Sequence, residues 1–185
     1  AGPPLVQASL GIQASPEELG GAAMHTSRSG VAHNLASDEQ AALTQARYFL
    51  SMLPQRHGEA PPREPRTGAA LPSDADALLD IIPPDGSQAY DMRAVLQSLA
   101  DRDTTMELQP GYGSSILCVL ARFGGVPAMV VANQPNLLAG AITRAAAEKA
   151  THFIEVARNQ KPKGYSRLRG RCSQRNGASG GIRSW

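Results

Sequence analysis

Two histidines are the first side chains in this 185-residue sequence whose type suggests chemistry. His25 and His33 lie eight residues apart in a segment of small polar residues. An imidazole with an ordinary pKa can act as a general base or bind a metal. The stretch supplies no third ligand, so we expect both rings to pack or to hydrogen-bond locally. The sequence also shows no nucleophile elbow, no catalytic cysteine setting and no metal-binding motif.

Two glycine-containing turns offer a different chemistry, which needs backbone groups and no titratable side chain. Gly20-Gly21 follows a short helix-forming segment, and a second loop follows an apolar strand and holds Asn133, Gln134, Pro135 and Gly140. Glycine lets the backbone approach a ligand closely, and fixed N–H groups stabilise a developing oxyanion. On the residues alone, the first turn reads as the end of a helix. The second loop is open between an ordinary strand end and a ligand site.

The elements that must position these turns are best defined between residues 111 and 157. Ile116–Ala121 is one apolar run. Ala128–Ala132 is apolar at odd and even positions alike, as in a strand buried on both faces. We expect a glycine pair with Pro127 to break the chain between the two strands. From Thr143 to Ala157, apolar residues recur at helical spacing.

The first quarter of the sequence predicts short helices separated by loops. Residues 1–19 read as extended and turn-rich, with one short helix that begins after Ser15. Residues 24–33 read as a loop. Ser37, with Gln40 three residues later, predicts a capping box and a helix that ends at the next proline.

Proline and glycine dominate the middle of the sequence. Residues 55–72 combine them with charges and have almost no apolar pattern, which is typical of a linker. After them we expect a short helix over Asp74–Ile82, a better-defined helix over Asp91–Leu99 and a strand over Thr104–Leu108. These predictions place both glycine turns in regions of mixed α/β structure.

Four single residues in the second half invite a structural interpretation. We expect Cys118 to be a small core residue and Arg122 to extend from a turn toward solvent. Lys149 could reach a phosphate, but a lysine on a helix face is usually solvated, and Tyr112 reads as a turn residue. None of them is assigned a catalytic role.

Charge is divided unevenly along the chain. Seven of the 18 Lys and Arg residues lie in residues 161–185, which hold no acidic residue. The preceding 160 residues therefore carry 11 basic against 16 acidic residues, a formal net charge of −5. This balance argues against nucleic acid as a partner. No run of 18 apolar residues predicts a membrane span, and no secretory signal is visible.

Several stretches, taken in order, resemble one protein family. They are EELGGAAMHTSRSGVAH, LDIIP, YDMRAVLQSLAD, MELQPGYGSSI, ARFGGVPAMVVANQP, LAGAIT and EKATHFIEVA. The sequence resembles the carboxyltransferase (β) subunit of biotin-dependent acyl-CoA carboxylases, and is closest to the propionyl-CoA and general acyl-CoA type. The resemblance runs from about Gly2 to Asn159. Because the sequence has no starting Met and the resemblance covers part of the family's length, we expect an incomplete chain.

The resemblance implies a crotonase-like (ClpP/crotonase) α/β fold. Residues 1–54 would be the end of the amino-terminal half-domain, 55–72 the linker, and 73–160 the start of the carboxy-terminal half-domain. Residues 161–185 depart from the family as a divergent basic tail, through a changed reading frame or a truncation, or else as a basic arm that binds acidic partners. The family's active site lies between halves of two subunits.

The resemblance also implies a reaction, in which a carboxyl group passes from carboxybiotin to the α-carbon of an acyl-CoA such as propionyl-CoA. In the matching LGG turn, the amides of Gly20 and Gly21 would form the oxyanion pocket that holds the enolate. On the side of the active site that faces the substrate and biotin, the resemblance implies the loop of Asn133, Gln134, Pro135 and Gly140. Biotin would sit on a partner's carrier domain, not covalently on this chain, and no metal is implied.

The implied partners are an acyl-CoA, a biotin carboxylase or biotin carrier subunit, and further carboxyltransferase subunits in a homo-oligomer, in the cytoplasm or mitochondrial matrix. Because the family's second glycine-rich turn is missing here, we expect this chain to be inactive alone. The alternative is a non-catalytic paralogue that associates with carboxylase subunits. A hydratase or isomerase of the wider crotonase group is disfavoured, since no pair of carboxylates stands out near Gly20-Gly21.

Overall fold

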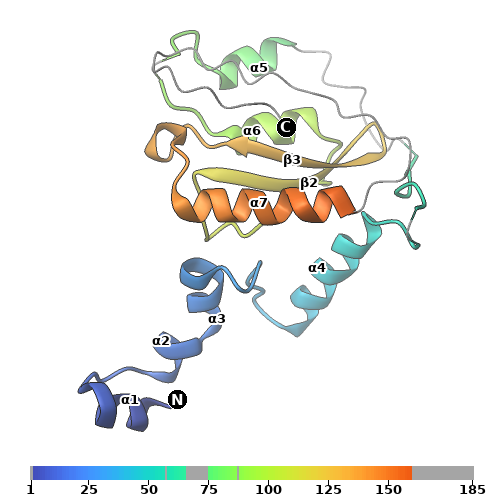
Figure 1. Ribbon diagram of the computed structural model, residues 1–185. Coiled ribbons are helices and arrows are strands. Elements are labelled where there is room, and N and C mark those ends of the chain that lie inside the picture. Colours follow the sequence, from blue (N-terminus) through green and yellow to red (C-terminus); the bar gives the residue numbers. More distant parts are fainter. Residues whose placement is uncertain (1, 57, 66–74, 87, 160–185) are drawn as a thin grey trace.

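A three-stranded antiparallel sheet lies at the centre of the protein. The computed structural model describes residues 2–56, 58–65, 75–86 and 88–159. The sheet is formed by β1 (Met106–Leu108), β2 (Ile116–Phe123) and β3 (Val126–Asn133), in the order β1-β2-β3. Leu120 in the middle strand pairs with Met106 on one side and with Met129 on the other. Helices α6 (Met92–Leu99) and α7 (Arg144–Asn159) contact β2, as Figure 1 shows.

Strand β2 is buried on both faces. Successive side chains of a strand point to opposite faces, so its two sets of apolar residues enter two different clusters. Ile116, Cys118 and Leu120 join Ala146 and Phe153 of α7 in one cluster. The other cluster joins Leu96 of α6 with the alternate residues of the strand, Leu117, Val119 and Ala121. The prediction that Cys118 is a core residue is confirmed, and burial raises the pKa of its thiol to about 11.

Strand β3 differs from its prediction in two ways. It lies at the edge of the described sheet, and Val131 is 39% exposed, so the expected burial on both faces is wrong. Pro127 does not break the chain but lies within β3, opposite Arg122. An edge position tolerates proline because one side of the strand needs no ladder partner. The turn is formed by Gly124 and Gly125, whose φ values of 61° and 79° suit a two-residue hairpin.

The amino-terminal helices are more continuous than expected. Residues 3–10 form helix α1 (Pro3–Leu10), so the prediction of an extended segment is wrong. The two prolines occupy the first helical positions, where a missing N–H costs nothing. Ser15 caps α2 (Pro16–Gly20) as predicted: its Oγ accepts from the Glu18 amide at 3.2 Å, and Glu18 Oε2 accepts from the Ser15 amide at 2.8 Å.

The predicted loop over residues 24–33 is wrong in its first half. Helix α3 (Ala22–Met24) continues into a π-helical turn η1 (His25–Ser29), and the chain leaves helical structure at Gly30, where φ is 67°. The small polar side chains bond back to their own backbone: Thr26 Oγ1 donates to the Ala22 carbonyl at 3.0 Å. Such bonds support local turns without any tertiary partner.

The remaining helices follow their predictions, apart from one cap. Helix α4 (Glu39–Ser51) begins after Asp38, whose carboxylate accepts from the Ala41 amide at 2.7 Å. Ser37 donates to Asp38 instead of capping, so the predicted capping box with Gln40 is wrong by one residue. The other helices confirm their expected positions: α5 (Ala75–Ile81), α6 after its cap Asp91, and α7 after its cap Thr143.

Arg122 joins three parts of the chain. It is 2% exposed, so the expected solvent position is wrong. Its guanidinium donates to the carbonyls of Pro62 at 2.8 Å and Ser51 at 3.0 Å, and it pairs with Glu64 at 2.9 Å. The end of α4 and part of the predicted linker are thereby held against the hairpin. Residues 57 and 66–72 of that linker and residues 161–185 lie outside the described residues, so the predicted boundaries stay predictions.

A stacked pair of histidines joins the segment after η1 to helix α7. The ring centroids of His33 and His152 lie 5.4 Å apart with 27° between the ring planes. Partial burial, and then the charge of the His152 ring, lower the pKa of His33 below its ordinary 6.5. The expectation of a local contact is confirmed for His25, whose Nδ1 lies 3.0 Å from Ser29 Oγ, whereas His33 packs against a ring from a distant part of the sequence.

Replacing Arg122 with methionine tests the joint formed by its guanidinium. We expect the free energy of unfolding to fall by about 3 kcal/mol, because several carbonyls and Glu64 lose their donor. Urea unfolding of wild type and variant measures the change. Arg56→Met is the matched control, since the Arg56–Glu59 pair is exposed at the surface and its loss should change stability by under about 0.5 kcal/mol. Equal losses in the two variants would contradict the assignment.

The His33–His152 stack predicts a pH dependence of stability. The folded state favours the neutral form of His33. Its contribution to the free energy of unfolding is therefore complete above about pH 6.5, and it is lost as the pH falls through 6.5 toward the folded-state pKa. His33→Gln should therefore lose less stability than wild type between about pH 7.5 and 5.5. Urea midpoints at the two pH values measure the difference. Parallel losses in both proteins would rule out His33 as the source.

Candidate functional site

The Gly20-Gly21 turn connects α2 to α3. The Gly21 amide donates to the Glu17 carbonyl at 2.9 Å, and the Gly21 carbonyl accepts from the His25 amide at 3.1 Å. A Cβ on Gly21 would lie 2.7 Å from the Glu17 carbonyl oxygen, so the position requires glycine although its φ is −72°. Gly20 is exposed and has more room, because its nearest neighbour would be His25 Nε2 at 3.8 Å.

This geometry changes which amides the turn can offer to a ligand. The Gly21 N–H is already engaged with Glu17. Amides in the first turn of a helix have no acceptor within that helix, and Ala22 and Ala23 occupy the first turn of α3. Glycine at position 21 therefore allows the backbone to turn sharply, and the amides that follow it are the donors that the turn can present.

The second predicted site, the loop after β3, is held by two amide side chains. Asn133 Nδ2 donates to the Gly140 carbonyl at 2.7 Å and closes the loop across its base. Gln134 is fully buried: its Oε1 accepts from the Met92 amide at 2.9 Å, and its Nε2 donates to Asp91 at 2.7 Å. The Gln134 side chain therefore fixes the loop to the start of α6 and is not available to a ligand.

Backbone strain is concentrated at the far end of the same loop. Leu138, Ala139 and Gly140 have φ values of 49°, 51° and 73° in a short 3-10 turn, η2 (Leu138–Gly140). Two non-glycine residues in the left-handed region cost about 1–3 kcal/mol each. Leu138 is also 69% exposed, so burial of its side chain does not offset the cost. Strain of this kind clusters at ligand-binding loops, which favours a functional role for the loop over an ordinary strand end.

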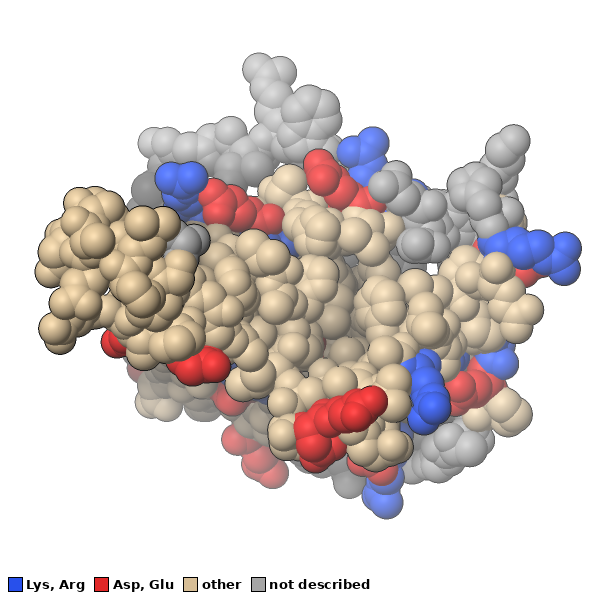
Figure 2. All heavy atoms as spheres, turned by 90° about the horizontal axis from the view of Figure 1, so that it is seen from below, with Lys and Arg blue, Asp and Glu red and all other residues tan. Residues whose placement is uncertain are grey.

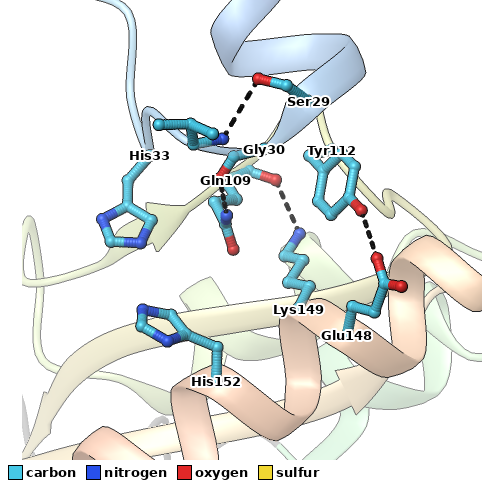
Figure 3. A pocket seen from close by; sticks show the side chains of 9 residues that line it. Ser29, Gly30, His33, Gln109, Tyr112, Glu148, Lys149 and His152 are labelled. Atoms are coloured by element: carbon cyan, nitrogen blue, oxygen red, sulfur yellow. Dashed lines mark hydrogen bonds between the residues drawn. The ribbon is translucent and has the colours of Figure 1, made fainter.

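A pocket of about 410 Å³ lies between the segment after η1 and the body of the protein. Figure 3 shows its walls: Ser29, Gly30 and His33 lie on one side, and Tyr112, Glu148, Lys149 and His152 lie on the other. Gln109 connects the two, since its Nε2 donates to the Gly30 carbonyl at 2.7 Å. The six predicted residues do not line this pocket: Gly20, Gly21, Asn133, Gln134, Pro135 and Gly140.

Lys149 forms part of the pocket floor. It is 1% exposed, so the expected solvated position is wrong, and its Nζ donates to the Gln109 carbonyl at 2.8 Å. Burial lowers the pKa of this ammonium group. The sequence did carry a signal, because Lys149 falls between Ala146 and Phe153 at the spacing of the buried helix face.

Tyr112 and Glu148 lie on the same side of the pocket as Lys149. The Tyr112 hydroxyl donates to Glu148 Oε2 at 2.7 Å, and Arg144 donates to the other carboxylate oxygen at 2.8 Å. The hydrogen bond from Arg144, and after it the bond from Tyr112, lower the pKa of Glu148. The bond to Glu148 in turn raises the pKa of the Tyr112 hydroxyl. Gly30 is required beside the ring, since a Cβ there would lie 2.7 Å from Tyr112 Cδ1. No sequence motif pointed to this pair.

The described part of the chain offers neither a metal site nor a membrane-spanning helix. No group of three or more His, Cys, Asp or Glu side chains within it could hold a metal ion. Among the same residues, no helix combines the length and apolar character needed to cross a membrane. The described geometry presents backbone amides at the start of α3 and polar side chains in the pocket around Lys149.

Comparison with known proteins places the fold. The transcarboxylase 12S crystal structure, a hexamer with methylmalonyl-coenzyme A and methylmalonic acid bound, superposes with a TM-score of 0.77 at 32% identity, over 83% of this chain and 29% of that one. A single-chain, multi-domain long-chain acyl-CoA carboxylase superposes with a TM-score of 0.69 at 29% identity, over 85% of this chain and 15% of that one. The expected crotonase-like α/β fold, present in part, is confirmed.

Sequence comparison agrees with the fold. Over 161 residues, the chain is 39% identical to the β5 subunit of a biotin-dependent acetyl-/propionyl-coenzyme A carboxylase of Mycobacterium tuberculosis, covering 84% of this chain and 29% of that subunit. It is 35% identical over 153 residues to methylmalonyl-CoA decarboxylase subunit alpha of Veillonella parvula, covering 83% and 30%. The chain thus spans about three-tenths of the length of these relatives. The model of the carboxyl transferase domain matches residues 1–161, and the chain belongs to that family.

Proposed function

We propose that this chain is part of the carboxyltransferase component of a biotin-dependent acyl-CoA carboxylase, which carboxylates the α-carbon of a propionyl-CoA-like thioester. The observation that carries the proposal is the continuous family match over residues 1–161. Relatives named as propionyl-CoA carboxylase β chains support the substrate class, including one from Saccharopolyspora erythraea at 38% identity. The chain contributes the Gly20-Gly21 turn and the loop after β3 to the complete site.

The chemistry at Gly20 and Gly21 is that of fixed backbone donors. Loss of the α-proton turns the thioester into an enolate, whose oxygen carries negative charge. Preorganised N–H groups stabilise such an oxygen without any titration of their own. The sharp turn at Gly21 would direct the amides at the start of α3 toward that oxygen, since the Gly21 amide itself is engaged with Glu17.

Biotin would be held at the loop after β3. Carboxybiotin, on a partner's carrier domain, supplies the carboxyl group when bound. The loop fits such a ligand through its backbone: it exposes the strained residues Leu138 and Ala139, while Asn133 closes its base. Pro135 and Gly140 shape the same turn, and Gln134 anchors it from inside.

The proposed partners are an acyl-CoA, a biotin carboxylase or biotin carrier subunit, and further copies of the carboxyltransferase subunit. The relatives' printed names support dependence on biotin, and the transcarboxylase 12S structure is described as a hexamer. On this proposal the protein works in the cytoplasm, or in the mitochondrial matrix of a eukaryote, where its acyl-CoA substrate must be present.

Acyl-CoA binding by calorimetry tests the glycine turn. We expect propionyl-CoA to bind more tightly than free coenzyme A or biotin. Gly21→Ala should weaken that binding by about tenfold or more, because the new Cβ would meet the Glu17 backbone and displace the turn. Gly86→Ala is the matched control, since a Cβ there meets nothing within 4 Å.

Two outcomes of that experiment would count against the proposal. If Gly21→Ala bound propionyl-CoA as tightly as the control, the site would lie elsewhere. If the wild-type chain bound none of the three compounds but still associated with a biotin carboxylase subunit, the non-catalytic paralogue would be the better reading.

Self-association is a separate expectation. Leu5, Leu10 and Ile12 are more than half exposed, and both β1 and β3 are edges of the described sheet. Figure 2 shows broad areas of one face without charged side chains. Exposed apolar surface and open strand edges favour association. Sedimentation velocity of the isolated chain should therefore show species larger than the monomer, and a single sharp monomer boundary at all concentrations would contradict this.

A further inference from the structure

The buried ammonium of Lys149 lacks a carboxylate partner in the described structure. None of the ion pairs among the described residues includes it, and its printed hydrogen bond is the one to the Gln109 carbonyl. The nearby acid, Glu107, receives two hydrogen bonds from Arg93, at 2.7 and 3.0 Å. A buried charge is costly unless it is paired, so the site around Lys149 favours an added negative charge.

The space beside Lys149 can hold that charge. The pocket of about 410 Å³ lies within the range of small-molecule sites in proteins. Lys149 and Gln109 are buried at its floor, whereas His33 and His152 are exposed at its mouth. Figure 3 shows the two imidazoles stacked on one another at the edge of the opening, beside the lysine. A ligand that enters beside the stack would meet ring nitrogens first and the ammonium next.

The one acid of the pocket wall does not neutralise Lys149. Glu148 accepts from Tyr112 and pairs with Arg144, which is exposed outside the pocket. Both of its oxygens are therefore engaged, and its charge is balanced by Arg144. The groups left to a ligand are the ammonium that is buried just beneath the floor, the two stacked imidazoles at the mouth and Ser29 at the side.

We propose that this pocket binds a small anion, with its carboxylate or phosphate group on the Lys149 ammonium. Such a group accepts several hydrogen bonds and would supply the missing counter-charge. The proposal is independent of carboxyl transfer, since the pocket contains none of the six residues assigned to that function. The ligand class is an anion with a carboxylate or phosphate group, and malonate and inorganic phosphate serve as probes that distinguish the two groups.

Titration of the 185-residue chain with malonate and with inorganic phosphate, at constant ionic strength set by chloride, tests the proposal. We expect saturable binding of one equivalent of at least one anion by calorimetry. Lys149→Met should weaken this binding by about tenfold or more, and His152→Gln by a smaller factor. Methionine keeps the length of the lysine stem, removes a buried charge that has no carboxylate partner and breaks one hydrogen bond, so the variant should remain folded.

Arg158→Gln is the matched control, because Arg158 is an exposed cation on the same helix, outside the pocket. Its binding should equal that of wild type. Binding of phosphate alone identifies a phosphate ester as the natural source, and binding of malonate alone identifies a carboxylic acid. Equal binding by wild type and Lys149→Met, or no saturable binding of either anion, would overturn the proposal. His152→Gln keeps the test decisive if Lys149→Met is unfolded, because the exposed His152 side chain does not hold the core. Unchanged anion affinity in His152→Gln would then refute the site.

Discussion

The burial of β2 on both faces is the constraint on which the rest of the structure depends. One set of its side chains packs with α7 and the alternate set with α6, so each helix has one position that covers the strand. A register shift of one residue would exchange the two sets and separate both helices from their partners. The hairpin to β3 then follows, and with it the point at which the chain leaves the sheet toward residues 133–140.

Buried polar side chains connect this core to everything else. Arg122 holds the end of α4 and the segment around Pro62, Gln134 fixes the loop after β3 to α6, and Lys149 joins α7 to Gln109. Each bonds to at least one backbone group, whose position is set by the main chain. The geometry of the proposed loop site is determined from beneath by Gln134, which does not itself face a ligand.

The parts of the fold that sequence could predict are those governed by local patterns. The cap at Ser15, the apolar strand at Ile116–Ala121 and the helix after Thr143 follow from rules that need only neighbouring residues. The burial of Arg122 could not be foreseen, since its partners lie about 60 and 71 residues away in the sequence. The pocket around Lys149 was missed for the same reason: its two walls come from segments far apart in the chain.

The contact between the amino-terminal helices and the body includes few buried apolar side chains. Helices α1, α2 and α3 contribute no buried residue, and the contacts beyond them include Gln109 with Gly30, Asn34 with the Glu107 carbonyl, the histidine stack and Gly30 against the Tyr112 ring. Opening such a contact exposes little hydrocarbon to water, so its free-energy cost is far below that of global unfolding. The helices that flank the Gly20-Gly21 turn are therefore expected to have a lower local stability than the sheet.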